Sequence, residues 1–113
     1  MPSERILKIN NLIRDVVGKV LLAEFRPEDD TALITVMRAE VSPTLEHATV
    51  YISVLPDDHG TAVLAELKKQ IYHLQQVINK QLVMRPVPKI KFEIDMTEAN
   101  ASRIEKLLQE VVE

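Results

Sequence analysis

The fold of this chain is decided between Ile34 and Val54, where the sequence reads ITVMRAEVSPTLEHATVYISV. In the second half, Val50 and Ile52 alternate with Thr, Tyr and Ser, and a period of two is typical of a strand with one buried face. The Ser-Pro-Thr connector at residues 42–44 has turn chemistry, because Pro fixes φ and hydroxyl groups bond the nearby backbone. The stretch therefore predicts an antiparallel strand pair with one face to be covered.

The composition suits one soluble domain spanning residues 1–113, because 46% of the residues are hydrophobic and 27% are charged. The chain has no Cys, which excludes disulfides and thiolate metal sites. No run approaches the ~20 apolar residues that cross a bilayer, and charged residues interrupt the N-terminal region, which argues against a signal peptide. We expect a cytoplasmic protein without a membrane partner.

The net charge of −3 is distributed unevenly along the chain. Residues 1–22 carry a net +2 and residues 61–92 a net +5, whereas residues 23–60 carry −6 and residues 93–113 carry −4. A nucleic-acid partner would therefore have to meet the first and third of these segments, turned away from the acidic remainder.

Apolar periodicity on both sides of the strand pair predicts three helices and a third strand. Helical spacing runs from about Glu4 to Leu22 and again from Thr61 to Leu82. Prolines 86 and 88 end the second helix, and alternation resumes over residues 89–95 as a strand. Asp95 or Thr97 can cap a last helix, whose inward residues are Ala101, Ile104, Leu108 and Val111.

The predicted order is α-β-β-α-β-α, an α+β fold in which helices cover one face of a three-stranded sheet in a single two-layer domain. The strand residues expected to face the helices are Val50, Ile52, Val54, Ile90, Phe92 and Ile94.

Two motifs resemble signatures of the bacterial ribosome-binding factor A family. The first is Val41-Ser42-x-x-Leu45-x-x-Ala48-x-Val50-Tyr51-Ile52-Ser53, and the second is Leu82-x-Met84-Arg85-x-Val87-Pro88-x-Ile90-x-Phe92-x-x-Asp95. The resemblance covers the whole chain. It implies a type II KH-like fold and a cytoplasmic, non-catalytic ribosome-biogenesis factor that binds the small ribosomal subunit and its rRNA and assists late rRNA maturation. It implies no cofactor and no small-molecule substrate, and we expect a monomer.

The chain departs from the family pattern in its second helix. Tyr72 stands where the family has a kink glycine, and Gln75 and Gln76 stand where basic residues are common. Because residues 61–100 lack glycine, we expect segment 61–82 to be straighter than is usual, or to bend through packing without a positive φ. These departures leave open an alternative function, a degenerate KH-like protein-interaction module without RNA binding.

Three sets of residues are candidates for RNA contact, because cations neutralise phosphates and an exposed aromatic ring can stack on a base. A wheel of the second helix places Lys69, His73, Gln76 and Lys80 on its outer face, with Tyr72 beside them. The first helix offers Arg5, Lys8 and Lys19, and the loop before the third strand offers Arg85 with Lys89. For each set the alternative interpretation is a solvated surface.

No catalytic or metal-binding constellation is evident. Asp57-Asp58-His59 supplies too few convergent ligands for zinc or a hard cation, and loop polarity with helix capping explains it. No serine lies in a nucleophile-elbow context. We therefore expect a protein that is not an enzyme.

Overall fold

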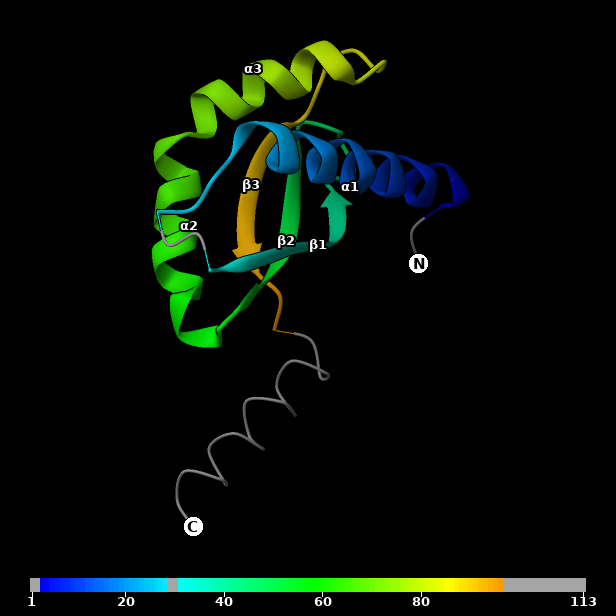
Figure 1. Cartoon of the computed structure of the whole chain (residues 1–113). Coiled ribbons are helices and arrows are strands. Elements are labelled where there is room, and N and C mark those ends of the chain that lie inside the picture. The colour runs from blue at the N-terminus through cyan, green and yellow to red at the C-terminus, as the bar shows by residue number, and fades with distance from the viewer. Residues whose placement is uncertain (1–2, 29–30, 97–113) are drawn as a thin grey trace.

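The computed structural model describes residues 3–28 and 31–96, so the predicted last helix lies outside the described residues. This part of the chain contains three α-helices and three strands, and Figure 1 shows how they are arranged. In chain order these are α1 (Glu4–Glu24), β1 (Leu33–Val41), β2 (His47–Leu55), a 3-10 turn η1 (Asp57–His59), α2 (Gly60–Lys69), α3 (Ile71–Gln81) and β3 (Lys89–Ile94). None of the described helices is long and apolar enough to cross a bilayer.

The sheet has the order β1-β2-β3, and its first pair is antiparallel as the sequence predicts. The turn of this pair is held by the Ser42 hydroxyl, which accepts the N–H groups of Glu46 and His47 at 3.2 and 3.1 Å. Leu45 takes a left-handed φ of 63° within it. β3 pairs with β2 in parallel, which requires the long crossover that α2 and α3 supply.

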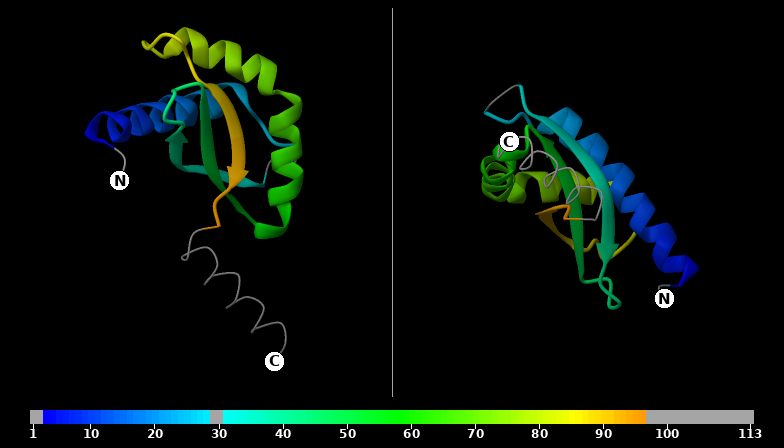
Figure 2. Two further views of the ribbon diagram at one scale, coloured as in Figure 1. Left: turned by 180° about the vertical axis from the view of Figure 1, so that it is seen from behind. Right: turned by 90° about the horizontal axis from the view of Figure 1, so that it is seen from below.

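The core lies between the sheet and helices that cover one of its faces (Figures 1 and 2). The predicted inward residues Val50, Ile52, Val54, Ile90 and Phe92 are buried and Ile94 is half-buried, which confirms the register. Phe92 is only 2% exposed.

The segment expected to form one helix from Thr61 to Leu82 is two helices, so this prediction is wrong. The chain turns sharply at Gln70, where φ is −99° and ψ is 6° (Figure 1). No positive φ accompanies the turn, since Leu45 has the only one among the described non-glycine residues. The break has a packing reason: α2 lies against β2 and β3, whereas α3 also packs on α1. The alternative expectation, a bend without glycine, therefore fits the structure.

The helix-free face of the sheet carries a charged cluster around Arg38. The Arg38 Nη1 atom lies 2.7 Å from Oδ1 of the buried Asp95, and the guanidinium stacks on the Tyr51 ring at 3.9 Å from its centroid. The hydrogen bond to Asp95 raises the pKa of Arg38 above its usual range. Because Arg38 lies on β1 and Asp95 follows β3, the pair joins the two outer strands across β2.

Candidate nucleic-acid interface

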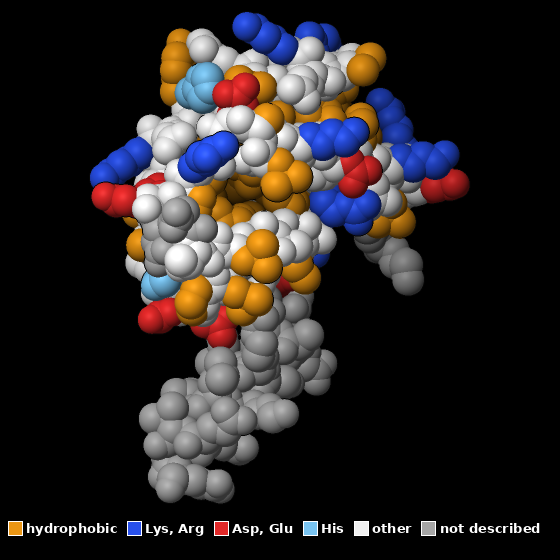
Figure 3. Space-filling view, viewed as in Figure 1, with side chains coloured by type: hydrophobic (Ala, Val, Ile, Leu, Met, Phe, Trp, Pro, Cys, Tyr) orange, Lys and Arg blue, Asp and Glu red, His pale blue; other side chains and the backbone are white. Residues whose placement is uncertain are grey.

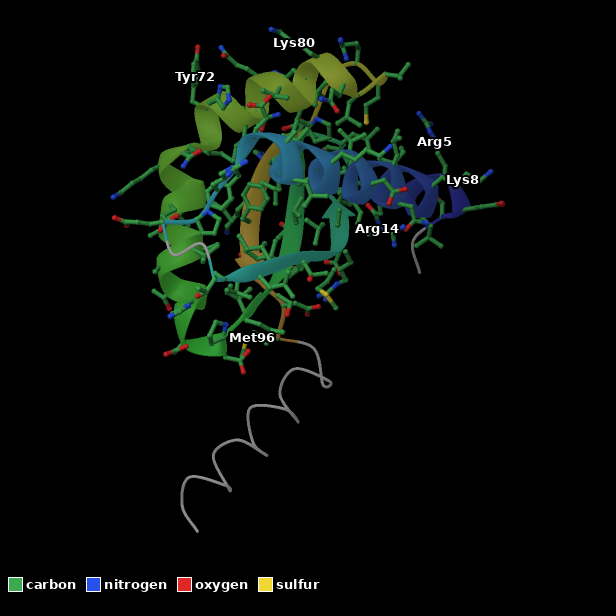
Figure 4. All side chains as sticks on the ribbon, viewed as in Figure 1. Arg5, Lys8, Arg14, Tyr72, Lys80 and Met96 are labelled. Carbon is green, nitrogen blue, oxygen red and sulfur yellow. The ribbon has the colours of Figure 1, made fainter. Side chains whose placement is uncertain are left out.

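The outer side of α3 is the best-formed part of the candidate interface. Tyr72 and Lys80 both project from it away from the sheet (Figure 4), and the Tyr72 side chain is 76% exposed. The sequence has no Asp or Glu between Glu66 and Glu93, so no carboxylate of this helix competes for the cation. An exposed ring and an ammonium group on one surface can serve RNA as a stacking platform and a phosphate contact.

Arg5 and Lys8 lie at the end of α1 that projects past the sheet (Figure 4). Lys8 makes an exposed ion pair with Glu4 at 3.7 Å, and such a pair contributes little and exchanges readily for a phosphate contact. Lys and Arg side chains can be followed over α3 and the N-terminal half of α1 in the space-filling view (Figure 3). The described structure thus places two predicted cations on a protruding, accessible helix end.

Arg85 has a structural role in the loop that leads to β3. Its Nη1 atom donates to the carbonyl oxygens of Leu82 and Met84 at 2.8 and 2.7 Å, so it satisfies carbonyl groups at the end of α3. The residue is still exposed, and so is Lys89 at the start of β3. The remaining guanidinium donors of Arg85 can reach a phosphate without breaking the cap.

His73 and Gln76 are exposed residues of α3. The Nε2 atom of His73 lies 3.3 Å from a carboxylate oxygen of Glu24, at the end of α1. A phosphate could bind His73 only if this carboxylate moved away, because the two anions would repel each other. His73 is therefore a weaker candidate for a phosphate contact than Lys80.

Two predicted residues do not share this surface. Lys69 is the last residue of α2, before the break, so it does not lie on the helical face of α3 as the wheel predicts. Lys19 borders a groove between α1 and β1. The prediction that Lys69 and Lys80 share one helical face is wrong, because a helical wheel assumes a single straight helix and this segment forms two.

Gln75 has a role that sequence reasoning missed. Its side-chain amide donates to the Pro88 carbonyl at 3.1 Å and its oxygen accepts the Ile90 N–H at 2.8 Å. An Arg or Lys side chain cannot accept the second bond, because neither has an acceptor. The absence of a basic residue at this position therefore reflects the anchoring of the loop to α3, and it is no sign of lost binding. The sequence sign of this role was the position of Gln75 directly after Leu74, a residue of the apolar stripe of the helix.

The described residues contain no group of three or more His, Cys, Asp or Glu side chains that could hold a metal ion. Asp57, Asp58 and His59 form the short turn η1 ahead of α2, in keeping with their interpretation as loop residues.

Comparison with known proteins identifies a single family. The model of the family described as ribosome-binding factor A matches residues 5–108. The chain is 35% identical to a ribosome-binding factor A of Rhodopseudomonas palustris over 109 residues, which cover 95% of this chain and 80% of that protein.

Solved structures share the fold. The crystal structure of ribosome-binding factor A from Thermus thermophilus superposes with a TM-score of 0.67 at 18% identity, covering 79% of this chain and 94% of that one. A homology model of the Thermus factor, fitted into a cryo-electron microscopy map of its complex with 30S, gives a TM-score of 0.64 at 19% identity. It covers 78% of this chain and 92% of the model. The chain therefore shares its α+β fold with these structures.

Proposed function

This chain belongs to the ribosome-binding factor A family, and from that premise we propose that it binds the small ribosomal subunit through its RNA and assists late rRNA maturation without catalysing a reaction. The name of the family and the 30S complex of the Thermus factor support the partner. The observation that carries the RNA contact is that Tyr72 and Lys80 are both exposed on the outer side of α3, a helix that has no Asp or Glu of its own.

The interface we propose consists of α3, the loop after it and the N-terminal half of α1. Its members are Tyr72, Lys80, Arg85, Lys89, Arg5 and Lys8, and His73 and Gln76 are peripheral contacts. Lys19 and Lys69 lie on neighbouring surfaces. The cations set position and orientation by meeting phosphates, and Tyr72 stacks on a base that is not paired. Binding of this kind acts by occupying and shaping a site on the immature subunit.

Co-sedimentation with small ribosomal subunits tests the proposal. We expect Lys80→Glu combined with Lys89→Glu to weaken association strongly, because two phosphate contacts become repulsive. Both side chains are exposed, so the fold should be preserved, which circular dichroism and urea unfolding would check.

The matched control is Arg26→Glu combined with Lys68→Glu. This pair of exposed residues changes the net charge by the same amount but lies outside the proposed interface, so binding should stay near the wild-type level. Equal losses for both double variants would mean that only the overall charge matters, and the local interface would be wrong.

Tyr72→Ala separates stacking from charge. If the ring stacks on a base, Tyr72→Ala should reduce the free energy of binding to the subunit by about 1–3 kcal/mol, and this reduction should change little with salt. Tyr72→Phe keeps the ring and should bind like the wild type. If Tyr72→Ala and the Lys80 and Lys89 reversals all leave association intact, the contact is made by another surface. The protein-interaction module then becomes the better description.

A further inference from the structure

An apolar groove lies on the helix side of the molecule, between the C-terminal half of α1 and the beginning of β1. Its volume is about 580 Å³, and its walls include Leu22, Phe25, Ile34 and Val36. Figure 3 shows a hollow with hydrophobic walls at the centre of this face. Leu22 is 87% exposed beside it. Open apolar surface of this kind marks a site that another apolar surface covers.

Gly18 adds a second, independent observation. It borders the groove in the middle of α1, and a Cβ atom built on it would meet no atom within 4 Å. Glycine inside a helix is destabilising relative to alanine, and no described neighbour requires a small residue there. What glycine does provide is close access to the helix backbone for an incoming segment.

We propose that residues 97–113 of this chain occupy the groove, packing an apolar stripe over Gly18. The stripe consists of Ile104, Leu108 and Val111, at the i, i+4, i+7 spacing of a helix that must bury one side. The segment has 17 residues, which is about 25 Å as a helix.

The segment starts close to the groove. The Asp95 N–H donates to the Ile52 carbonyl at 2.8 Å, and Ile52 is paired with Val36, a groove residue. The described chain therefore ends two strands away from the groove wall, a distance of about 10 Å. Met96, the last described residue, lies at the lower edge of the sheet, on the side where β3 ends (Figure 4).

Charge also favours this occupant. Residues 97–113 carry four glutamates against one arginine and one lysine, whereas the α1 side of the groove carries Arg14 and Lys19 against Asp15. An acidic amphipathic segment fits a groove whose rim has a net positive charge. A second copy of the chain or an apolar stretch of another protein has no comparable tether.

Disulfide trapping in the full-length chain tests this directly, because the wild type contains no Cys. We expect Leu22→Cys with Leu108→Cys to close an intramolecular disulfide under mild oxidation, seen as faster migration on a non-reducing gel. The control pair is Lys91→Cys with Leu108→Cys. Lys91 is exposed on β3, on the opposite face of the sheet, and is much nearer to the segment along the chain.

A freely moving segment would favour Lys91, because the shorter tether gives the higher effective concentration. A docked segment reverses the preference, and we expect the Leu22 pair to close about tenfold faster than the control. Gly18→Leu should abolish the advantage by filling the groove. Faster closure at Lys91, disulfides between separate chains, or an advantage that survives Gly18→Leu would each overturn the proposal.

Discussion

At the scale of the residue, Gln75 shows how one side chain decides the geometry of the loop that leads to β3. Its amide group pairs with the backbone of Pro88 and Ile90 as a neighbouring strand would, and this fixes the position from which Lys89 projects. The loop is therefore set by α3 itself, so the cations before and on β3 keep a constant relation to Tyr72.

Replacing Gln75 by Ala should reduce the free energy of unfolding by about 1–3 kcal/mol, because a half-buried N–H and carbonyl lose their partners. Hydrogen exchange at the Ile90 amide should accelerate as well. Urea unfolding measures the first effect and exchange NMR the second. Gln76→Ala is the control, since that side chain is exposed and should change stability by less than about 0.5 kcal/mol. Equal effects of the two substitutions would contradict the anchoring role.

Tyr51 offers a prediction on pH at the same scale. Burial raises the pKa of its phenol above the ordinary value of 10.0, and the nearby charges of Glu40 and Glu93 add to the shift. Because the folded pKa is raised, the stabilisation is fully present below pH 10.0 and is lost as the pH rises through the folded value.

Tyrosinate absorbance of the Tyr72→Phe variant would measure this pKa, since Tyr51 is then the only tyrosine and the chain has no Trp. The midpoint should lie above that of the same chain in denaturant, and Glu40→Gln should lower it. A folded midpoint at or below the denatured one would show that the Tyr51 phenol is not desolvated in the folded protein.

At the scale of the element, β3 forms one edge of the sheet and contributes a large apolar side chain to the core. Phe92 points from it into the core and is almost fully buried, and its neighbour Lys91 points to the other face and is exposed. We expect Phe92→Ala to cost about 3–5 kcal/mol through loss of burial and a residual cavity.

Lys91→Ala should cost less than about 0.5 kcal/mol, because the ion pair that Lys91 makes with Glu93 is exposed. Urea unfolding of both variants provides the comparison. A small loss for Phe92→Ala would mean that β3 does not hold the core in solution.

At the scale of the whole molecule, a chain of net charge −3 binds a polyanion only through local separation of charge. The cations proposed for the interface lie on α1, on α3 and in the segment that leads into β3; they are Arg5, Lys8, Lys80, Arg85 and Lys89. Log K for association with the small subunit should fall by about 3.5–4.5 per tenfold rise in salt if all five meet phosphates.

A salt series of the wild-type protein gives this slope, and the Lys80 and Lys89 reversals should reduce its magnitude by about 1.4–1.8. A flat salt dependence would indicate a contact with ribosomal protein alone.

The sequence by itself determined the local features of this protein. Alternation fixed which faces of β2 and β3 are buried, as Ile52 and Phe92 confirm, because a strand has a period of two and a slip of one residue would expose its apolar set. Two motifs at matching separation identified the family. The exposed Tyr72 and Lys80 were also found this way, since residues opposite an apolar stripe face water.

Only the tertiary structure decided features that depend on contacts between distant segments. The break at Gln70 allows α3 to pack on α1 while α2 packs on β2 and β3, and it separates Lys69 from the helical face of Lys80. The parallel pairing of β3 with β2 and the two bonds of Gln75 join residues that no short-range pattern connects. Periodicity reports which side of an element is buried, but the direction of an element and its neighbours depend on how the whole chain packs.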